Sequence, residues 1–268
     1  MKLKKCRLCD KKKFKKLFSL GNLSYTGKFP KKFSLNIPKE NITLTMCDNC
    51  KLVQLNKNFS EKYLYGKDYG YRTGINHTMT NHVKMIAKEA QKVAQIRKGD
   101  CVLDIASNDG TLLNFYSKNL IRVGIDPIIS KFLSYYNNID YKVNDFFSFE
   151  ALQKKKINKK YKIITALSVF YDLKKPHKFI RDIKKILHKD GVFILEHADL
   201  LSIIKQNLFD TICHEHLEYY SSKIIISIMK KHHLRVFDLK LNNINGGSIR
   251  YFISHEFSKF KSKNIIIN

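Results

Sequence analysis

The stretch Cys101-Val-Leu-Asp-Ile-Ala-Ser-Asn-Asp-Gly-Thr-Leu-Leu113 indicates the fold class of this 268-residue chain. Its first six residues are apolar except for Asp104, as in a strand that is buried on both faces of a parallel sheet. Small and polar residues follow, and a helix is predicted after Gly110. A strand that passes through such a turn into a helix is typical of a doubly wound α/β fold, which binds its ligand at the carboxyl ends of the strands.

Strands and helices alternate along the rest of the chain. Further strands are predicted over 121–126, 139–145, 162–169 and 191–197, with helices over 128–136 and 176–188. A helix over 221–233 precedes two last strands, HLRVFDLKL and 246–255, which have no helix between them. We therefore expect an α/β fold with a Rossmann-like parallel sheet that ends in an antiparallel strand.

The region before this sheet has a different pattern. Residues 77–96 are predicted to form one amphipathic helix with an apolar face made by Met79, Val83, Ile86, Ala90 and Val93. Residues 1 to about 60 contain only short β-like pieces and turns. So short a region is too small for an apolar core of its own, and we expect a metal ion to stabilise it.

Four of the six cysteines form two pairs, Cys6-Arg-Leu-Cys9 and Cys47-Asp-Asn-Cys50, with 37 residues between them. Each turn presents two thiolates on one side of a loop, and two such turns complete a tetrahedral site of four sulfurs. This donor set favours a structural Zn²⁺, whose full coordination sphere leaves no open position for chemistry. A redox pair would be a single C-x-x-C motif, and the lack of a secretory signal disfavours disulfides.

The loop after the first strand of the sheet is the candidate cofactor site. Asp126 ends the second strand, 22 residues after Asp104, where a carboxylate can accept both ribose hydroxyls of a nucleoside. The dinucleotide fingerprint G-x-G-x-x-G is absent, and an acidic loop suits a sulfonium cation better than a pyrophosphate. We therefore favour S-adenosylmethionine (SAM) over a nicotinamide cofactor; the alternative is that both carboxylates only cap loops. The candidate binding residues are Asp104, Ala106, Ser107, Asn108, Asp109, Gly110 and Asp126.

A second polar cluster is the string DTICHEHLEYY, residues 210–220. His214 and His216 flank Glu215, a pattern that fits metal ligation, proton transfer or plain surface histidines. A metal would need a third ligand, for which Glu218 and His197 are candidates. A general base needs an imidazole with a pKa near neutrality and a carboxylate beside it, which His216 and Glu215 supply.

The net charge of +27 raises the possibility of a nucleic-acid partner. Only seven of the 50 basic residues are arginine, and the lysines are scattered along the chain. Abundant Lys, Ile, Asn, Phe and Tyr have A/T-rich codons, so codon bias accounts for the charge and nucleic acid is disfavoured. No apolar run approaches the roughly 20 residues of a membrane helix. We expect a cytoplasmic protein with no membrane partner.

The motifs C-x-x-C…C-x-x-C, YGYRTG, VLDIASNDGTLL, FDTICHEHLEYYS and NGGSIRYF occur in this order. Together they resemble the zinc-containing sugar C-methyltransferase family over nearly the whole chain. The resemblance implies SAM-dependent methylation of the carbon next to the keto group of a nucleotide-linked 4-keto deoxysugar. It also implies His216 as the base, Glu215 as the adjoining acid with His214 beside it, and a tyrosine from YGYRTG, Tyr71 or its neighbour Tyr69.

The resemblance also implies the domain boundaries. They are a zinc-binding domain at 1–62, a connector with the amphipathic helix at 63–98, a methyltransferase core at 99–256 and a truncated tail at 257–268. The family continues into a further domain, so a partner subunit could replace it. Phe252, Ile253 and the closing KNIIIN are a candidate apolar edge for that partner.

Two residues depart from the family pattern. Cys213 stands where characterised members carry Tyr, and Asp172 stands where they carry His. Either family side chain could hold an enolate oxygen, so the sugar substrate is less firmly implied than methyl transfer. The alternatives are an O- or N-methyltransferase of another small molecule, and a basic zinc-knuckle protein that binds nucleic acid with a degenerate methyltransferase core.

Overall fold

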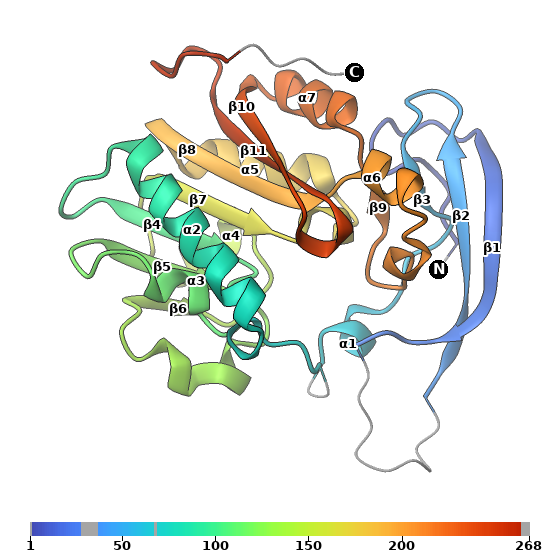
Figure 1. Ribbon diagram of the computed structural model, residues 1–268, viewed down its shortest axis with the longest axis horizontal. Helices are drawn as coiled ribbons and strands as arrows, with labels where there is room; N and C mark the ends of the chain where they lie inside the picture. Colours follow the sequence, from blue (N-terminus) through green and yellow to red (C-terminus); the bar gives the residue numbers. More distant parts are fainter. Residues whose placement is uncertain (1, 28–36, 67–68, 264–268) are drawn as a thin grey trace.

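The computed structural model describes residues 2–27, 37–66 and 69–263. It contains a seven-stranded sheet and a four-stranded sheet, which lie side by side (Figure 1). The larger sheet has the strand order β10-β11-β8-β7-β4-β5-β6. Its strands are β4 (Cys101–Ile105), β5 (Ile121–Ile125), β6 (Tyr141–Val143), β7 (Tyr161–Leu167), β8 (Leu187–Ala198), β10 (Leu234–Asn242) and β11 (Ser248–His255).

The direction of the strands agrees with the sequence prediction. Strands β4 to β8 pair in parallel, whereas β11 pairs antiparallel with both of its neighbours, β8 and β10. The carboxyl ends of β4, β5 and β7 therefore meet at one edge of the sheet, as a doubly wound fold requires of its ligand site. The predicted parallel sheet with an antiparallel final strand is confirmed.

Helices cover both faces of this sheet because neighbouring residues of its strands point to opposite sides. Ile163 packs with α2 (His77–Ala94) and α3 (Thr111–Asn114), whereas Ile164 packs on the opposite face. That face is covered by α4 (Phe149–Lys154), α5 (Pro176–Ile186) and α7 (Ser222–Lys231). Asn76 caps α2 by accepting a hydrogen bond from the amide of Met79.

Three predicted elements differ from the structure. The helix predicted over 128–136 is a 3₁₀ segment, Ile129–Tyr136, that is kinked at Phe132. The strand predicted over 139–145 shrinks to β6, because this strand lies at the edge of the sheet and pairs only with β5. The helix after Gly110 is the single turn α3.

The smaller sheet has the order β1-β2-β3-β9. Its first three strands are β1 (Phe14–Ser24), β2 (Lys39–Cys47) and β3 (Val53–Leu55), followed by the short helix α1 (Glu61–Leu64). Its fourth strand, β9 (Glu218–Tyr219), comes from the far end of the chain and pairs antiparallel with β3. Residues 1–62 therefore do not complete this sheet alone.

An apolar cluster packs against the smaller sheet. The sequence predicted that residues 1 to about 60 are too few to form an apolar core. Ile42, Leu44 and Leu55 supply part of this cluster. Further residues come from the segment between β8 and β9, which includes α6 (Leu200–Lys205) and contributes Ile203, Ile212 and Leu217, and from Tyr219 of β9. The prediction was wrong because it counted only residues that are close in sequence.

Arg7, in the first cysteine turn, fastens β3 to the segment that leads into β9. Its side chain is buried and donates hydrogen bonds to the backbone carbonyls of Leu55 at 2.9 Å, Lys57 at 2.9 Å and Leu217 at 3.3 Å. It also lies 3.9 Å from the buried carboxylate of Glu218. The Arg7 guanidinium thus contacts a residue that lies 210 positions later in the chain.

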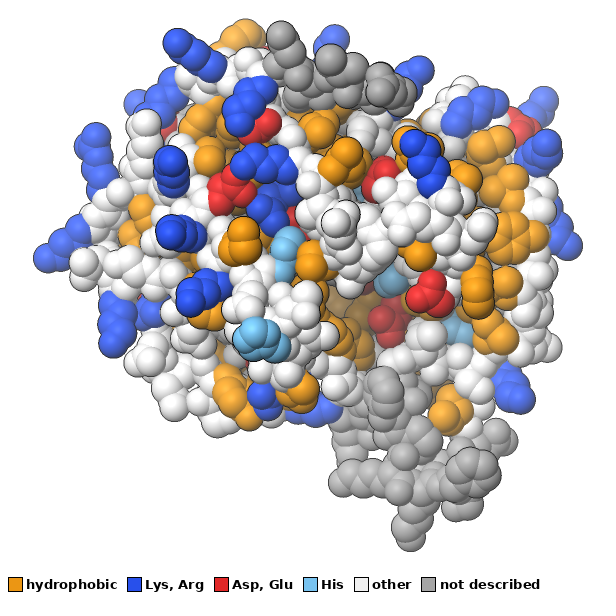
Figure 2. All heavy atoms as spheres, in the orientation of Figure 1, with side chains coloured by type: hydrophobic (Ala, Val, Ile, Leu, Met, Phe, Trp, Pro, Cys, Tyr) orange, Lys and Arg blue, Asp and Glu red, His pale blue; other side chains and the backbone are white. Residues whose placement is uncertain are grey.

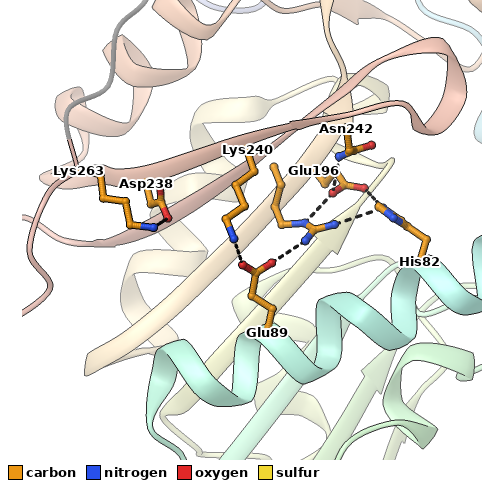
Figure 3. A network of polar contacts seen from close by, with 8 residues as sticks. His82, Glu89, Glu196, Asp238, Lys240, Asn242 and Lys263 are labelled. Carbon is orange, nitrogen blue, oxygen red and sulfur yellow. Dashed lines mark hydrogen bonds and ion pairs between the residues drawn. The ribbon is translucent and has the colours of Figure 1, made fainter.

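A buried polar network holds α2 against the larger sheet (Figure 3). Glu196 on β8 accepts from Arg250 of β11 at 2.7 Å and from Asn242 of β10 at 3.2 Å, and it also pairs with His82 of α2. Arg250 reaches Glu89 of α2 at 2.7 Å. The mutual attraction of these charges and their hydrogen bonds offset the cost of removing them from water, and removal of one partner would leave a buried charge unpaired.

The burial of β11 bears on the predicted apolar edge for a partner subunit. Phe252 and Ile253 are only 1% and 0% exposed, because β11 is an inner strand, so they form no apolar edge. Residues 264–268 of the closing segment lie outside the described residues.

Lys and Arg side chains are spread over the visible face rather than gathered in one stripe (Figure 2). Among the described residues, no helix has both the length and the apolar character that crossing a membrane requires.

Replacing Arg7 by alanine should destabilise the protein strongly. The carbonyls of Leu55, Lys57 and Leu217 would lose the guanidinium donor, although Leu217 would keep the amide of Leu55. Each buried group left without a partner costs about 1–3 kcal/mol. For a chain of this size a loss of about 3 kcal/mol lowers Tm by roughly 6–12 °C. Differential scanning calorimetry measures the shift, with Lys5→Ala, an exposed neighbour, as the control. Equal Tm values for the two variants would contradict the bridging role of Arg7.

Candidate active site and zinc centre

A cavity of about 860 Å³ lies between the two sheets. Figure 2 shows acidic and histidine side chains in the hollow between them. Ligand sites of small molecules span roughly 300–1,000 Å³, so the volume suits a cofactor together with a second small molecule. Of the sequence-predicted residues, the cavity is lined by Asp104, Ala106, Ser107, Asn108, Asp126, Tyr71, Glu215 and His216, and by Tyr69.

The loop after β4 bends sharply beside this cavity. Ala106 and Asn108 have φ values of 57° and 50°, in the left-handed region that non-glycine residues seldom adopt. Gly110 continues the turn with φ 75°, which glycine adopts without strain. The larger sheet leaves little room behind the loop, since a methyl group on Gly124 would lie 2.9 Å from the Ser107 hydroxyl. The small residues therefore serve a close backbone turn.

Asp104 and Asp126 are buried carboxyl groups at the carboxyl ends of β4 and β5. Burial raises the pKa of Asp104 to about 7, although Thr165 donates a hydrogen bond to it at 2.5 Å. Burial also raises the pKa of Asp126 to about 6, against the effect of hydrogen bonds from the amides of Asn108 and Ile128, both at 2.9 Å. Two desolvated acids beside a cavity favour a ligand that brings hydroxyl donors or positive charge.

Asn108 and Asp109 form hydrogen bonds with the YGYRTG segment. The Asn108 side chain accepts from the amide of Thr73 at 2.9 Å, and Asp109 accepts from the amide of Gly74 at 2.9 Å. Asp109 also lies 3.2 Å from the guanidinium of Arg72. Asp109 and Gly110 do not line the cavity, so these contacts hold the YGYRTG segment over the loop instead.

His214 lies apart from the cavity. It is 0% exposed, stacks on Tyr25 with ring centroids 4.7 Å apart and meets the edge of Phe59. Its Nε2 donates to the carbonyl of Glu40 at 3.2 Å, and burial lowers its pKa. The structure thus gives His214 a packing position in the smaller sheet.

His216 faces the cavity, and a backbone contact fixes its tautomer. Its Nδ1 donates to the carbonyl of Thr211 at 2.7 Å, which leaves Nε2 to exchange a proton. Tyr171 packs on the ring at 4.3 Å between centroids. Burial by itself would lower the pKa of His216, but the neighbouring Cys213 and Asp172 outweigh it and raise the pKa to about 10.

Glu215 lines the same cavity on the side of the smaller sheet. Burial raises its pKa, and the charge of His216 opposes that shift. A methyl group on Gly27 would lie 2.5 Å from its Oε1 atom, so the backbone of Gly27 approaches the carboxyl group closely. The residues that follow β1 therefore form part of the wall of the cavity beside Glu215.

Of the two candidate tyrosines, Tyr69 lies nearer to the acidic groups. The negative charges of Glu215 and Asp172 act on Tyr69, whose pKa is raised mainly by burial. Tyr71 is 44% exposed, and its pKa, also raised by burial, is influenced by Asp109. Both line the cavity, but Tyr69 is the better placed for contact with a substrate beside Glu215.

From the sequence, Asp172 stands out only as a departure from the family pattern, and Tyr65 is not among the predicted site residues. Both line the cavity, and their side chains share a hydrogen bond. Asp172 follows β7 in the 3₁₀ turn Phe170–Asp172, beside the loop after β4. Its position at the end of a strand of the parallel sheet was the available signal.

The four paired cysteines meet in the smaller sheet. Sγ atoms of Cys6 and Cys50 are 3.5 Å apart, as are those of Cys9 and Cys47, and all four lie within 4.8 Å of one another. Sulfurs around a tetrahedral Zn²⁺ at about 2.3 Å would be separated by roughly 3.8 Å. The donor set and spacing therefore fit Zn²⁺, which would be bound by four sulfurs with no open position.

Comparisons with known proteins agree with these features. A family model described as “Methyltransferase domain” matches residues 75–239, more than half of the chain. A model described as “Putative zinc binding domain” matches residues 6–65. The chain belongs to the methyltransferase family with an N-terminal zinc-binding domain. Residues 75–239 are its methyltransferase domain.

The chain is also similar to individual proteins in sequence or in fold. The chain is 25% identical over 221 residues to the C-methyltransferase NovU of Streptomyces niveus, a match that covers 79% of this chain and 50% of NovU. The chain thus spans about half the length of this relative. A SAM-dependent methyltransferase from Clostridium acetobutylicum shares the fold at 13% identity and a TM-score of 0.51, covering 66% of this chain and 92% of that one.

A second solved structure has the same fold. The plantazolicin methyltransferase BamL, in complex with S-adenosylhomocysteine and a triazolic analogue, is 12% identical with a TM-score of 0.50. The match covers 67% of this methyltransferase and 86% of BamL.

Loss of one cysteine ligand should remove zinc from the methyltransferase. Cys47→Ser should reduce the zinc content from about one ion per chain to well below that, because a hydroxyl is a poor Zn²⁺ ligand. Tm should fall as well, since a structural metal contributes folding free energy. Inductively coupled plasma mass spectrometry and a melting curve measure both, with the exposed Asp48→Asn in the same turn as the control. Full zinc content in Cys47→Ser would contradict the four-sulfur site.

Proposed function

We propose that this methyltransferase methylates carbon next to the keto group of a nucleotide-linked 4-keto deoxysugar. The observation that carries the proposal is that the candidate cofactor loop and His216 line one cavity. Its volume of about 860 Å³ leaves room for a substrate beside the cofactor. The likeness to NovU, which is named a C-methyltransferase, supports carbon as the acceptor.

We assign cofactor binding to the loop from Asp104 to Asn108 and to Asp126. The Asp126 carboxyl group would accept the ribose hydroxyls, and the acidic loop would favour the sulfonium charge. SAM, when bound, supplies an electrophilic methyl group. Asp109 and Gly110 act on this site indirectly, because their contacts shape the loop and hold the YGYRTG segment.

We assign the role of general base to His216. Its Nδ1–H bond to Thr211 orients Nε2, which would take the proton from the carbon beside the keto group. Because its pKa is raised to about 10, His216 is a strong base, but it must first lose its own proton. Turnover should therefore rise with pH on the acidic side of the profile. Glu215 would stabilise the protonated imidazole, and Tyr69 would contact the substrate.

Solvent deuterium exchange tests this function. In D₂O, the wild-type protein should introduce deuterium next to the keto group of 4-keto deoxysugar nucleotides. His216→Ala should lower that rate by about 10²–10⁴-fold, the usual contribution of a general base. Its affinity for SAM in calorimetry should stay unchanged. His77→Ala, an exposed histidine on α2, is the control and should exchange like the wild type.

Two outcomes would contradict the proposal. No wash-in with any candidate sugar, in a protein that binds SAM, would favour methylation of oxygen or nitrogen in another small molecule. Normal wash-in by His216→Ala would assign proton abstraction to another residue.

A further inference from the structure

Three lysines line one part of the cavity, and the assignments above leave them without a role. They are Lys174, Lys175 and Lys178. Lys174 and Lys175 connect the 3₁₀ turn Phe170–Asp172 to α5, and Lys178 lies in the first turn of that helix. The connection follows β7, so the lysines lie towards the edge of the sheet where its parallel strands end and where such a fold binds its ligand.

These lysines give the cavity wall two parts that differ in charge. Among the described residues, every lysine that lines the cavity comes from residues 174–178. Asp104 and Asp126 line it at the ends of β4 and β5, and Glu215 lines it beside His216. An anionic group of a ligand is therefore attracted to the lysine segment and repelled by the acidic groups elsewhere in the wall.

Two of the lysines are held in place by carboxylates, and the third has no partner. Lys174 lies 2.9 Å from Glu61, and Lys178 lies 2.6 Å from the buried Asp182. The side chains of these two lysines remain 33% and 40% exposed, and each ammonium group has three donors, so both can bind a further acceptor. Lys175 is exposed and forms no hydrogen bond or ion pair with the other described residues.

The lysines also lie at a suitable distance from the proposed base. Asp172 lines the cavity and interacts electrostatically with His216, and Lys174 is two residues further along the chain. Two residues of chain span at most about 7 Å. In a 4-keto deoxysugar nucleotide, the diphosphate is attached across the sugar ring from the keto group. A sugar whose reacting carbon faces His216 would therefore bring its diphosphate towards the lysines.

We propose that Lys174, Lys175 and Lys178 bind the diphosphate group of the substrate, while the sugar lies beside His216. This inference rests on the function proposed above, and it assigns the direction in which a nucleotide-linked sugar lies in the cavity. Each phosphate carries a negative charge, and hydrogen bonds from ammonium groups to phosphate oxygens are among the strong ones in proteins.

Calorimetric titration with nucleoside diphosphates tests this site without any turnover. The probes are the diphosphates of uridine, thymidine, guanosine and cytidine, and saturating S-adenosylhomocysteine keeps them out of the cofactor site. At least one should bind the wild type, and its nucleoside should bind about 10-fold more weakly or worse, because it lacks the phosphates. The affinity for the diphosphate should fall as the salt concentration rises, since salt screens exposed charges.

Substitution of the two lysines before α5 should weaken this binding. Lys174→Ala/Lys175→Ala should raise the Kd of the nucleoside diphosphate by about 10–100-fold and leave that of the nucleoside unchanged. Lys174→Arg/Lys175→Arg keeps both charges and should stay within about 5-fold of the wild type. Lys189→Ala, an exposed lysine of β8 that does not line the cavity, is the matched control.

Lys178 is kept in all of these variants. It also pairs with Glu150 at 2.7 Å, and its loss would weaken the pairing of the buried Asp182. The other two lysines are on the surface, so their replacement should leave Tm unchanged.

Kinetics with a 4-keto sugar nucleotide give a second readout. The double alanine variant should raise KM and keep kcat within about 3-fold of the wild type, because the diphosphate is bound equally in the ground state and in the transition state. A general loss of structure would lower kcat as well.

The outcomes separate this inference from the proposed function. The lysine site is refuted if no nucleoside diphosphate binds the wild type, if the nucleoside binds as tightly as its diphosphate, or if the double alanine variant binds like Lys189→Ala. It is also refuted if the double arginine variant loses as much affinity as the double alanine variant. If nucleotides bind as expected and no 4-keto sugar nucleotide takes up deuterium, the lysine site stands and the proposed C-methylation fails.

Discussion

The buried guanidinium of Arg7 joins the N-terminal part of the smaller sheet to the segment that completes this sheet from the far end of the chain. It belongs to a cysteine turn, and it donates to the carbonyls of Leu55 in β3 and Leu217 next to β9. Leu217 directly follows His216, so the position of the catalytic candidate is tied to the zinc-binding turn by one side chain.

The active site concentrates charges that would destabilise an ordinary protein interior. Asp104, Asp126, Asp172 and Glu215 all have raised pKa values because burial penalises their charged forms. Such perturbed groups gather at functional sites, where a ligand supplies the missing partners. The cavity thus has the proposed cofactor-binding acids Asp104 and Asp126 in one part of its wall, and Glu215 with the proposed base His216 in another.

The strands of the larger sheet were predictable because their signal is local. Residues 101–105 and 121–125 are mostly apolar runs, each with one charged residue, and a turn follows each of them. A shift of either boundary by one residue would not change the prediction of a strand. The same holds for the cysteines, since the C-x-x-C spacing already specifies two thiolates on one side of a turn. The antiparallel last strand followed from the lack of a helix between β10 and β11.

Other features depend on contacts between distant residues and could not be predicted in this way. β9 has two residues and pairs with β3, about 160 positions earlier, without any periodic pattern. His214 and His216 look equivalent in the sequence, yet the irregular backbone turns one into the smaller sheet and the other to the cavity. Likewise, Asp109 resembles a cofactor ligand until the structure places Gly74 and Arg72 beside it.

The most direct test of this account is a crystal structure of the protein with S-adenosylhomocysteine. We predict that the ribose hydroxyls lie within hydrogen-bond distance of Asp126 and that the sulfur faces His216 and Asp172 across open cavity. A sulfur separated from His216 by protein atoms, or a nucleoside bound away from Asp126, would contradict the claim that one cavity holds both the cofactor and the proposed base.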